Sequence, residues 1–159
     1  MVAAMVEPQD LVRRIPSRRF ATRAPVVRNA HLIPPAAQDA MAYAWGTRDY
    51  PPRDVTIHRV PGAFVLGEGL VFDHTGVVVR PTITQHSPAE VDAAEALLHA
   101  AMTTGAIPFI PGTTLLCAKR GAVNYGHWLY EMLPVAALGL AELQAGAWRA
   151  MVPHASGPL

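Results

Sequence analysis

Residues Asn124–Pro134 read Asn-Tyr-Gly-His-Trp-Leu-Tyr-Glu-Met-Leu-Pro, and our interpretation of the fold begins with them. They join an apolar, strand-like run, Thr114–Ala118, to a helical pattern that begins near Tyr125. At about 3.6 residues per turn, the polar side chains of Asn124, His127 and Glu131 fall on one face of such a helix. The apolar residues that keep the spacing of a buried stripe are Trp128, Met132, Ala136, Leu140 and Leu143.

The three polar residues have two interpretations. In the structural one, Asn124 caps the helix, His127 donates to a backbone carbonyl, and Glu131 is a solvated residue near the helix start, where negative charge is favoured. In the functional one, an amide, an imidazole and a carboxylate together form a site at the mouth of one helix. For Trp128, packing between helix and sheet is the preferred interpretation.

The elements around this stretch predict a β-α-β unit. The strand Thr114–Ala118, the helix, and a second strand-like run, Trp148–Val152, imply two parallel strands with a right-handed crossover. Ligands of such sheets bind beyond the carboxyl ends of the strands, which here is the loop Lys119–Asn124. Pro134 leaves two alternatives open: a kinked helix, or two short helices that meet at Leu133.

Earlier residues predict an antiparallel β meander. Four short runs rich in β-branched and aromatic residues are separated by glycine-containing turns, and Asp73-His-Thr-Gly76 has the composition of a hairpin loop. Acid–base chemistry by Asp73 is disfavoured, because a turn aspartate is usually structural. The four runs are Val55–Val60, Ala63–Leu66, Leu70–Phe72 and Val77–Val79.

A helix is predicted after the meander. Ser87 can cap it, Pro88 suits its first position, Glu90 completes a capping box, and Gly105 ends it. The expected buried stripe consists of Val91, Ala94, Leu97, Leu98 and Met102.

Composition narrows the class of protein. The 159 residues are 51% hydrophobic and 16% charged, with a formal net charge of +1, so we expect a globular chain without nucleic acid as its main partner. The single cysteine, Cys117, lies in an apolar run and is interpreted as a buried structural thiol rather than a nucleophile. No apolar run approaches the length of a membrane span, and we expect a cytoplasmic protein.

The segment 1–54 is expected to be irregular, and residues 55–159 to form the α/β lobe. Leu11–Ile15 is predicted as one or two helical turns, and several prolines suggest an extended path. The segment is basic, which indicates a solvated arm, or weak contact with an anionic membrane surface or an acidic partner. Its arginines are Arg13, Arg14, Arg18, Arg19, Arg23 and Arg28.

The string Asn124–Pro134 resembles the motif of glycosyltransferase family 61, many of whose bacterial members act in capsular polysaccharide biosynthesis. Pro111–Leu115 and the strand-rich region with Gly76-Val-Val78 are also similar to the front half of such proteins, and the similarity covers about Val55–Pro153. The resemblance implies a GT-B architecture and inverting transfer of a sugar from a nucleotide-sugar to a polysaccharide or glycan acceptor. It also implies that this chain is the N-terminal, acceptor-side lobe, Rossmann-like and incomplete, and inactive without a donor-binding lobe.

Inverting transfer needs a base for the acceptor hydroxyl and positive groups for the leaving diphosphate. His127 or Glu131 is the candidate base, with His127 preferred because imidazoles titrate near neutral pH; Glu131 could instead orient His127. Positive charge on the loop and the helix N-terminus could face the diphosphate, and Asn124 could bind a sugar hydroxyl. The expected substrate-binding residues are Asn124, Lys119, Arg120 and Tyr125.

Other chemistries have little support. His58, His74 and His86 lack the spacing of a metal site, and no glycine-rich phosphate loop is present, so we expect neither a metal nor a cofactor. The alternative to a transferase lobe is a noncatalytic fragment or interaction module that keeps the fold.

Overall fold

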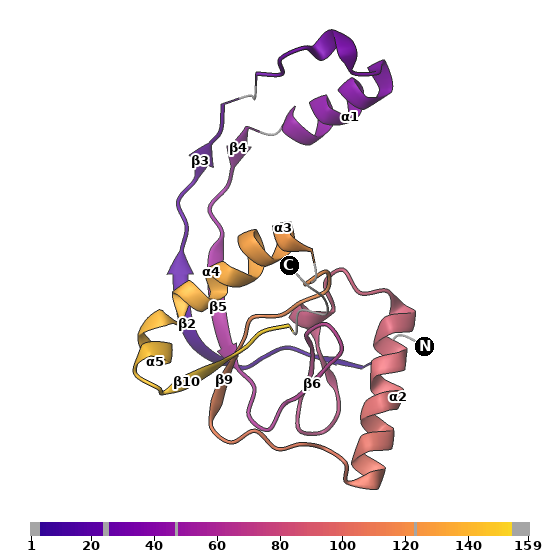
Figure 1. Ribbon diagram of the computed structural model, residues 1–159. Coiled ribbons are helices and arrows are strands. Elements are labelled where there is room, and N and C mark those ends of the chain that lie inside the picture. Colours follow the sequence, from indigo (N-terminus) through magenta and orange to yellow (C-terminus); the bar gives the residue numbers. More distant parts are fainter. Residues whose placement is uncertain (1–3, 24–25, 47, 123, 154–159) are drawn as a thin grey trace. The chain divides into compact units, whose positions relative to one another are not determined.

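The computed structural model describes residues 4–23, 26–46, 48–122 and 124–153. The chain divides into two compact units. We call Asp10–Arg59 the ribbon unit, and Met1–Gln9 together with Val60–Leu159 the core unit. Several small sheets and a few helices make up the two units (Figure 1), so the predicted mixed α/β class is confirmed.

The core unit contains a four-stranded sheet in the order β1-β8-β7-β6. Strands β6 (Phe64–Leu66), β7 (Leu70–Phe72) and β8 (Val78–Val79) pair antiparallel as a meander, and β1 (Met5–Val6) adds to β8 in parallel. These three antiparallel strands confirm the second, third and fourth runs of the predicted meander.

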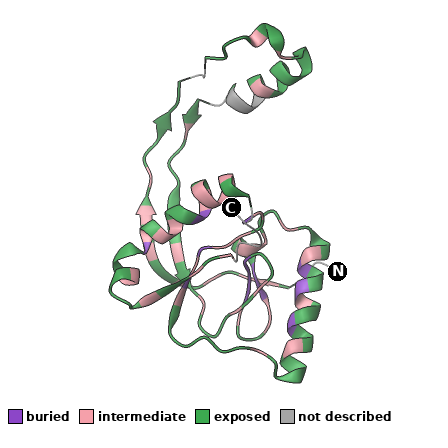
Figure 2. Ribbon diagram, viewed as in Figure 1, coloured by how far each residue is buried: buried purple, intermediate pink, exposed green. Residues whose placement is uncertain are grey.

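Helix α2 (Pro88–Thr104) packs against this sheet and completes the main core. The capping box is present: Ser87 Oγ accepts from the Glu90 N–H, Glu90 accepts from the Ser87 N–H, and Gly105 ends the helix with a φ of 68°. Two predictions on the stripe were wrong, because Leu97 is 60% exposed and Met102 46% exposed. The buried cluster (Figure 2) consists of Leu70, Phe72, Val78, Val91, Ala94 and Leu98.

The predicted β-α-β unit is present in the same part of the chain. β9 (Thr113–Leu116) and β10 (Trp148–Met151) pair in parallel, with Leu116 opposite Met151. Between them lie α3 (Tyr125–His127), the helical turn η3 (Trp128–Met132), α4 (Leu133–Leu138) and α5 (Leu140–Gln144).

The junction between α4 and α5 approaches the two parallel strands closely. A Cβ on the buried Gly139 would lie 2.7 Å from Leu115 Cδ2 and 3.2 Å from the Trp148 ring. Only a glycine allows this approach, and it fixes the helical segment against the sheet.

The segment before Pro134 is a π-helical turn, which neither of the two predicted alternatives included. The Leu133 N–H donates to the Trp128 carbonyl, five residues back, and α4 then begins at Leu133 with Pro134 in its first turn. Proline has no N–H to donate and is tolerated in the first turn of a helix. The arrangement is therefore closer to two short helices that meet at Leu133, with the π turn as their connection. Of the predicted apolar stripe, Met132 is buried, while Leu140 is 51% exposed.

The ribbon unit is built from two antiparallel strand pairs. β2 (Asp10–Pro16) pairs with β5 (Asp54–Arg59), and β3 (Phe20–Ala21) with β4 (Asp49–Tyr50). Residues between β3 and β4 form the single turn η1 (Ala30–Leu32) and helix α1 (Pro35–Gly46).

Two predictions for this region were wrong. Leu11–Ile15 lies in strand β2 rather than in a helical turn, and the run Val55–Val60 pairs with β2 as part of β5 rather than joining the meander. The reason is a strand pairing between residues about forty to fifty positions apart, which leaves no local signal in the sequence. In the core unit, the single turn η2 (Arg80–Ile83) follows β8, and its Thr82 hydroxyl accepts from the Val71 N–H and donates to the Val79 carbonyl.

None of the described helices is both long and apolar enough to cross a membrane.

Candidate functional site

The loop that follows β9 carries the candidate site. Its first residue, Cys117, extends the pairing with β10, because the Cys117 N–H donates to the Met151 carbonyl over 2.9 Å. The thiol is buried, and desolvation raises its pKa. A buried, protonated thiol is a poor nucleophile, which agrees with its interpretation as a structural residue.

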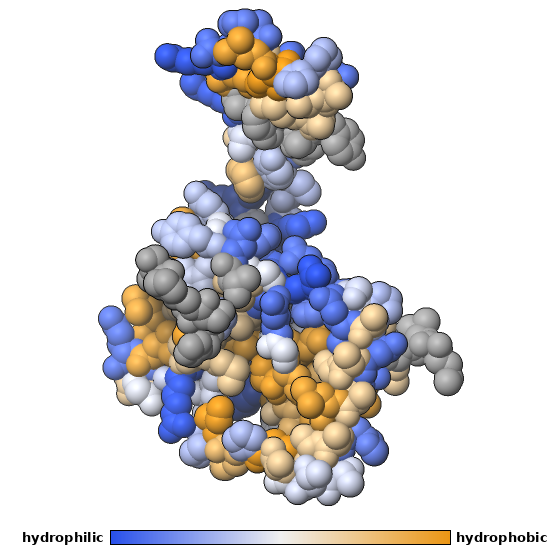
Figure 3. Space-filling view, turned by 45° about the vertical axis from the view of Figure 1, so that its right-hand side comes forward, coloured by the Kyte–Doolittle hydropathy of each residue, from blue (hydrophilic) through white to orange (hydrophobic). Residues whose placement is uncertain are grey.

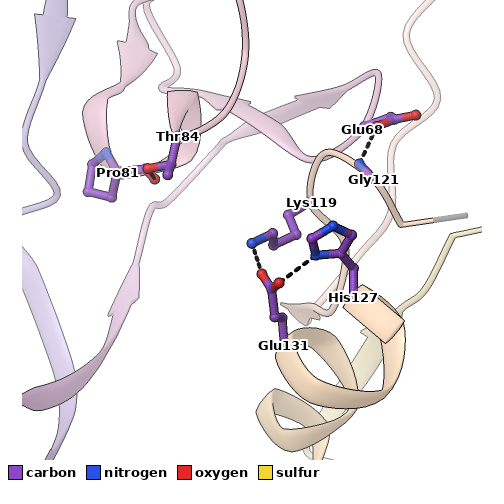
Figure 4. A network of polar contacts seen from close by, with 7 residues as sticks. All are labelled: Glu68, Pro81, Thr84, Lys119, Gly121, His127 and Glu131. Atoms are coloured by element: carbon purple, nitrogen blue, oxygen red, sulfur yellow. Dashed lines mark hydrogen bonds and ion pairs between the residues drawn. The ribbon is translucent and has the colours of Figure 1, made fainter. Parts of the chain in front are cut away.

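Three side chains meet beyond this loop (Figure 4). His127 Nδ1 lies 2.5 Å from Glu131 Oε1, and Lys119 Nζ forms an ion pair with Glu131 Oε2. We call Lys119, His127 and Glu131 the polar triad. Each side chain is about one third exposed, at 34%, 39% and 35% respectively, so the triad is neither sealed in the core nor fully solvated.

The local chain geometry explains the triad. His127 ends α3, and Glu131 lies four residues on within η3, so the two side chains stand one turn apart on the same side of the helical segment. Lys119 reaches Glu131 from the loop after β9. With Nδ1 directed at a carboxylate that Lys119 neutralises, the favourable tautomer carries its proton on Nδ1 and leaves the Nε2 lone pair available.

The remaining predicted site residues lie elsewhere. Asn124 Oδ1 accepts from the Gly126 N–H over 2.9 Å and caps α3, as in the structural interpretation. Arg120 Nε donates to Glu90 Oε1 over 2.9 Å, at the start of α2. Tyr125 is 71% exposed. The structure therefore brings His127, Glu131 and Lys119 together, but neither the Asn124 amide nor the Arg120 guanidinium has a hydrogen bond to them among the described residues.

Two residues of the site were missed in the sequence. The Gly121 N–H donates to Glu68 Oε2 over 2.6 Å, and a Cβ on Gly121 would lie 3.2 Å from Cδ2 of the His127 ring. Glu68 sits at the turn between β6 and β7, where Gly67 and Gly69 both have positive φ. The Gly-Glu-Gly sequence does signal a tight turn, but its contact with a loop more than fifty residues away has no sequence signal.

Gly69 explains why the β6–β7 turn lies against the loop. Its φ is +87°, and a Cβ there would come within 2.4 Å of the Ala118 carbonyl oxygen. This approach places Glu68 next to Gly121 and holds the loop from the side opposite to η3 (Figure 4).

Asp73 has a structural role. Its Oδ1 accepts from the Thr75 N–H, the Thr75 hydroxyl and the Val77 N–H, over 2.9, 2.7 and 3.0 Å. The Thr75 hydroxyl is the main cause of the lowered pKa of Asp73. This carboxylate closes the β7–β8 hairpin. Among the described residues, no three histidine, cysteine or acidic side chains are grouped so that they could hold a metal ion.

Comparison of the chain with protein-family models, with curated proteins and with solved structures found no match. A partly exposed imidazole, oriented by a carboxylate that a lysine neutralises, can take a proton from a hydroxyl group at Nε2 and hold it as imidazolium.

Proposed function

We propose that the core unit carries the acceptor-side site of an inverting glycosyltransferase of GT-B, Rossmann-like type, with His127 as the general base. The contact between His127 Nδ1 and Glu131 Oε1 is the main support for this proposal, because it orients a partly exposed imidazole and leaves Nε2 out of that contact. The resemblance of Asn124–Pro134 to the family 61 motif supplies the substrate classes: a nucleotide-sugar donor and a polysaccharide or glycan acceptor.

In the proposed reaction, an acceptor hydroxyl attacks the anomeric carbon of the donor sugar from the face opposite to the diphosphate. The new carbon–oxygen bond forms as the bond to the diphosphate breaks, so the anomeric configuration inverts. The hydroxyl proton passes to His127 Nε2, and the nucleoside diphosphate leaves with the bonding electron pair. Glu131 stabilises the resulting imidazolium, and Lys119 holds Glu131 in place.

The test compares two substitutions at the triad in the natural gene product that carries this chain. His127→Ala removes the base, and we expect transfer from a nucleotide-sugar to fall by about a hundredfold or more. Glu131→Gln keeps the size of the side chain but removes the charge opposite the imidazolium, so we expect a smaller loss and an altered pH profile of kcat/KM. Tyr130→Phe, at a 77% exposed residue of η3 that is not among the predicted site residues, serves as the control for each rate.

A specific result would contradict the proposal. If His127→Ala lowers the melting temperature while transfer activity stays unchanged, His127 only packs and does not act as a base. A panel of nucleotide-sugars, assayed by release of the nucleoside diphosphate, would identify the donor.

An interaction module is the second candidate function, and the charge of the ribbon unit favours it. Nine arginines against four aspartates give residues 10–59 a formal charge of +5, and Val26 is 88% exposed. Positive charge combined with exposed apolar side chains is suited to an anionic membrane surface. Cosedimentation with vesicles that contain phosphatidylserine, compared with phosphatidylcholine alone, tests this function, and equal binding to both would exclude charge-driven contact.

A further inference from the structure

Three consecutive residues of the loop each donate to a carboxylate from a different element. Lys119 Nζ pairs with Glu131 in η3, Arg120 Nε with Glu90 in α2 at 2.9 Å, and the Gly121 N–H with Glu68 at 2.6 Å. Two cationic side chains and one backbone N–H, all close together in the chain, are donors that suit a phosphate group. In this structure the protein's own carboxylates occupy all three.

The three carboxylates differ in how firmly they are held. Glu90 also accepts from the Ser87 N–H and the Ser87 hydroxyl over 2.7 and 2.8 Å, and these bonds together with Arg120 lower its pKa to about 2. Glu131 is also held by His127. For the exposed Glu68, the Gly121 N–H is the one hydrogen-bond partner found among the described residues.

The backbone around Glu68 and Gly121 suits an exchangeable contact. Gly121 has a φ of +82°, a left-handed conformation that favours glycine. Glu68 lies between Gly67 and Gly69, so its side chain can leave the N–H while Gly69 stays packed on Ala118. Loss of the contact costs one hydrogen bond and removes one negative charge from the neighbourhood of Lys119 and Arg120.

We propose that Glu68 occupies an anion subsite, and that a diphosphate displaces it from the Gly121 N–H. This inference rests on the proposed transfer function for its ligand class, the diphosphate of a nucleotide-sugar. The incoming phosphate oxygen takes the hydrogen bond that Glu68 gives up, and Lys119 and Arg120 supply the adjacent positive charge. Glu68 therefore competes with the donor for the Gly121 N–H. The apparent affinity for the diphosphate falls as the fraction of molecules in which Glu68 stays bound to that N–H rises.

The experiment titrates the full chain with inorganic pyrophosphate at constant ionic strength and follows the amide signal of Gly121 by NMR. Glu68→Gln keeps the shape of the side chain but removes its charge, so we expect pyrophosphate to bind about tenfold more tightly. The matched control is Glu95→Gln, which removes the same charge from α2 at a residue with no hydrogen bond to the loop among the described residues. The control should keep the affinity of the unmodified chain.

Several outcomes would overturn the inference. Equal affinities in the Glu68→Gln and Glu95→Gln variants would show that only net charge matters, and an unshifted Gly121 signal would place any binding elsewhere. Equal affinity for inorganic phosphate would overturn the assignment to a diphosphate. The two proposals can fail separately: pyrophosphate binding at Gly121 in an unmodified chain that transfers no sugar would leave the anion subsite standing and remove only the transferase proposal. His127→Ala should still bind pyrophosphate, because His127 supplies none of the donors of the proposed subsite, and loss of binding in that variant would contradict the assignment.

Discussion

The core unit and the ribbon unit are stabilised in different ways. All twelve buried hydrophobic residues of the described chain lie in the core unit. None of the described side chains of the ribbon unit is buried (Figure 2). Their charges also differ: four basic and eight acidic residues give the core unit a formal charge of −4, against +5 for the ribbon unit. Apolar side chains also reach the surface (Figure 3), among them Phe109, which is 86% exposed.

The ribbon unit relies on backbone pairing and on contacts across its strands. Arg59 Nε lies 2.7 Å from Asp10 Oδ2, Arg14 pairs with Asp54, and Arg19 pairs with Asp49. Exposed ion pairs of this kind contribute little to stability, and an isolated two-stranded ribbon is marginal in water. The comparison indicates that burial stabilises one unit and strand pairing the other. It also shows that two of the arginines expected in a solvated arm, Arg14 and Arg19, are paired with aspartates.

The largest expected effect comes from removing an aromatic ring in each unit. Phe72 is fully buried in the core unit, whereas Phe20 stacks on Tyr50 with ring centroids 4.7 Å apart and is 55% exposed. Phe72→Ala should lower the free energy of unfolding by about 3–5 kcal/mol, because it leaves a cavity. Phe20→Ala should cost about 0.5–1.5 kcal/mol, the value of an aromatic pair. Urea denaturation followed by circular dichroism measures both, and equal losses would contradict the comparison.

Next in size is the effect of a side chain at the contact between the β6–β7 turn and the loop. Gly69→Ala introduces a left-handed backbone strain of about 1–2 kcal/mol and a clash with the Ala118 carbonyl. Gly67→Ala is the matched control, since its φ is also positive but no atom lies within 4 Å of the added Cβ. Thermal unfolding should show the larger loss of stability for Gly69→Ala. The same loss of stability in both variants would mean that the close approach of Gly69 to Ala118 does not contribute to stability.

Acid should weaken the core unit through the Glu90 carboxylate at the start of α2. In the core unit the pKa of Glu90 is lowered to about 2, mainly by the Ser87 N–H, so its stabilising contribution is complete above its ordinary pKa of 4.5 and is lost as the pH falls toward 2. Glu90→Gln should therefore flatten the decline in stability between pH 5 and about pH 2. Urea midpoints across that interval test the effect, and an unchanged slope would show that the capping box does not contribute.

The smallest effect is expected from removing the ribbon unit. Asp10 and Arg59 face each other in the β2–β5 pair, so Gln9 and Val60 can be joined by a short glycine-serine linker. No residue of the described hydrophobic core lies between Gln9 and Val60 in the chain. The shortened chain should therefore keep the unfolding midpoint of the core unit within a few degrees. Loss of cooperative unfolding in that variant would show that the core unit depends on the ribbon.

The sequence predicted what is encoded locally. The capping box at Ser87 and Glu90, the Asp73 turn, and the alternation of β9, helix and β10 all depend on residues a few positions apart, and all are present. The contact of His127 with Glu131 follows from the same helical spacing. The pairing of β2 with β5 and the contact of Glu68 with Gly121 were missed, because each joins segments about forty residues or more apart. The outward positions of Leu97 and Met102 also depend on which face of α2 the sheet covers.

The π turn makes the orientation of the site depend on the number of residues in η3. Because the Leu133 N–H reaches back five residues to Trp128, η3 holds one residue more than an ordinary helical turn. Deleting that extra residue would restore a regular helix and rotate His127 by about 100° about the helix axis, relative to α4. The direction of the imidazole therefore depends partly on the number of residues in η3. A single-codon deletion in η3 would change that direction while leaving His127 itself intact.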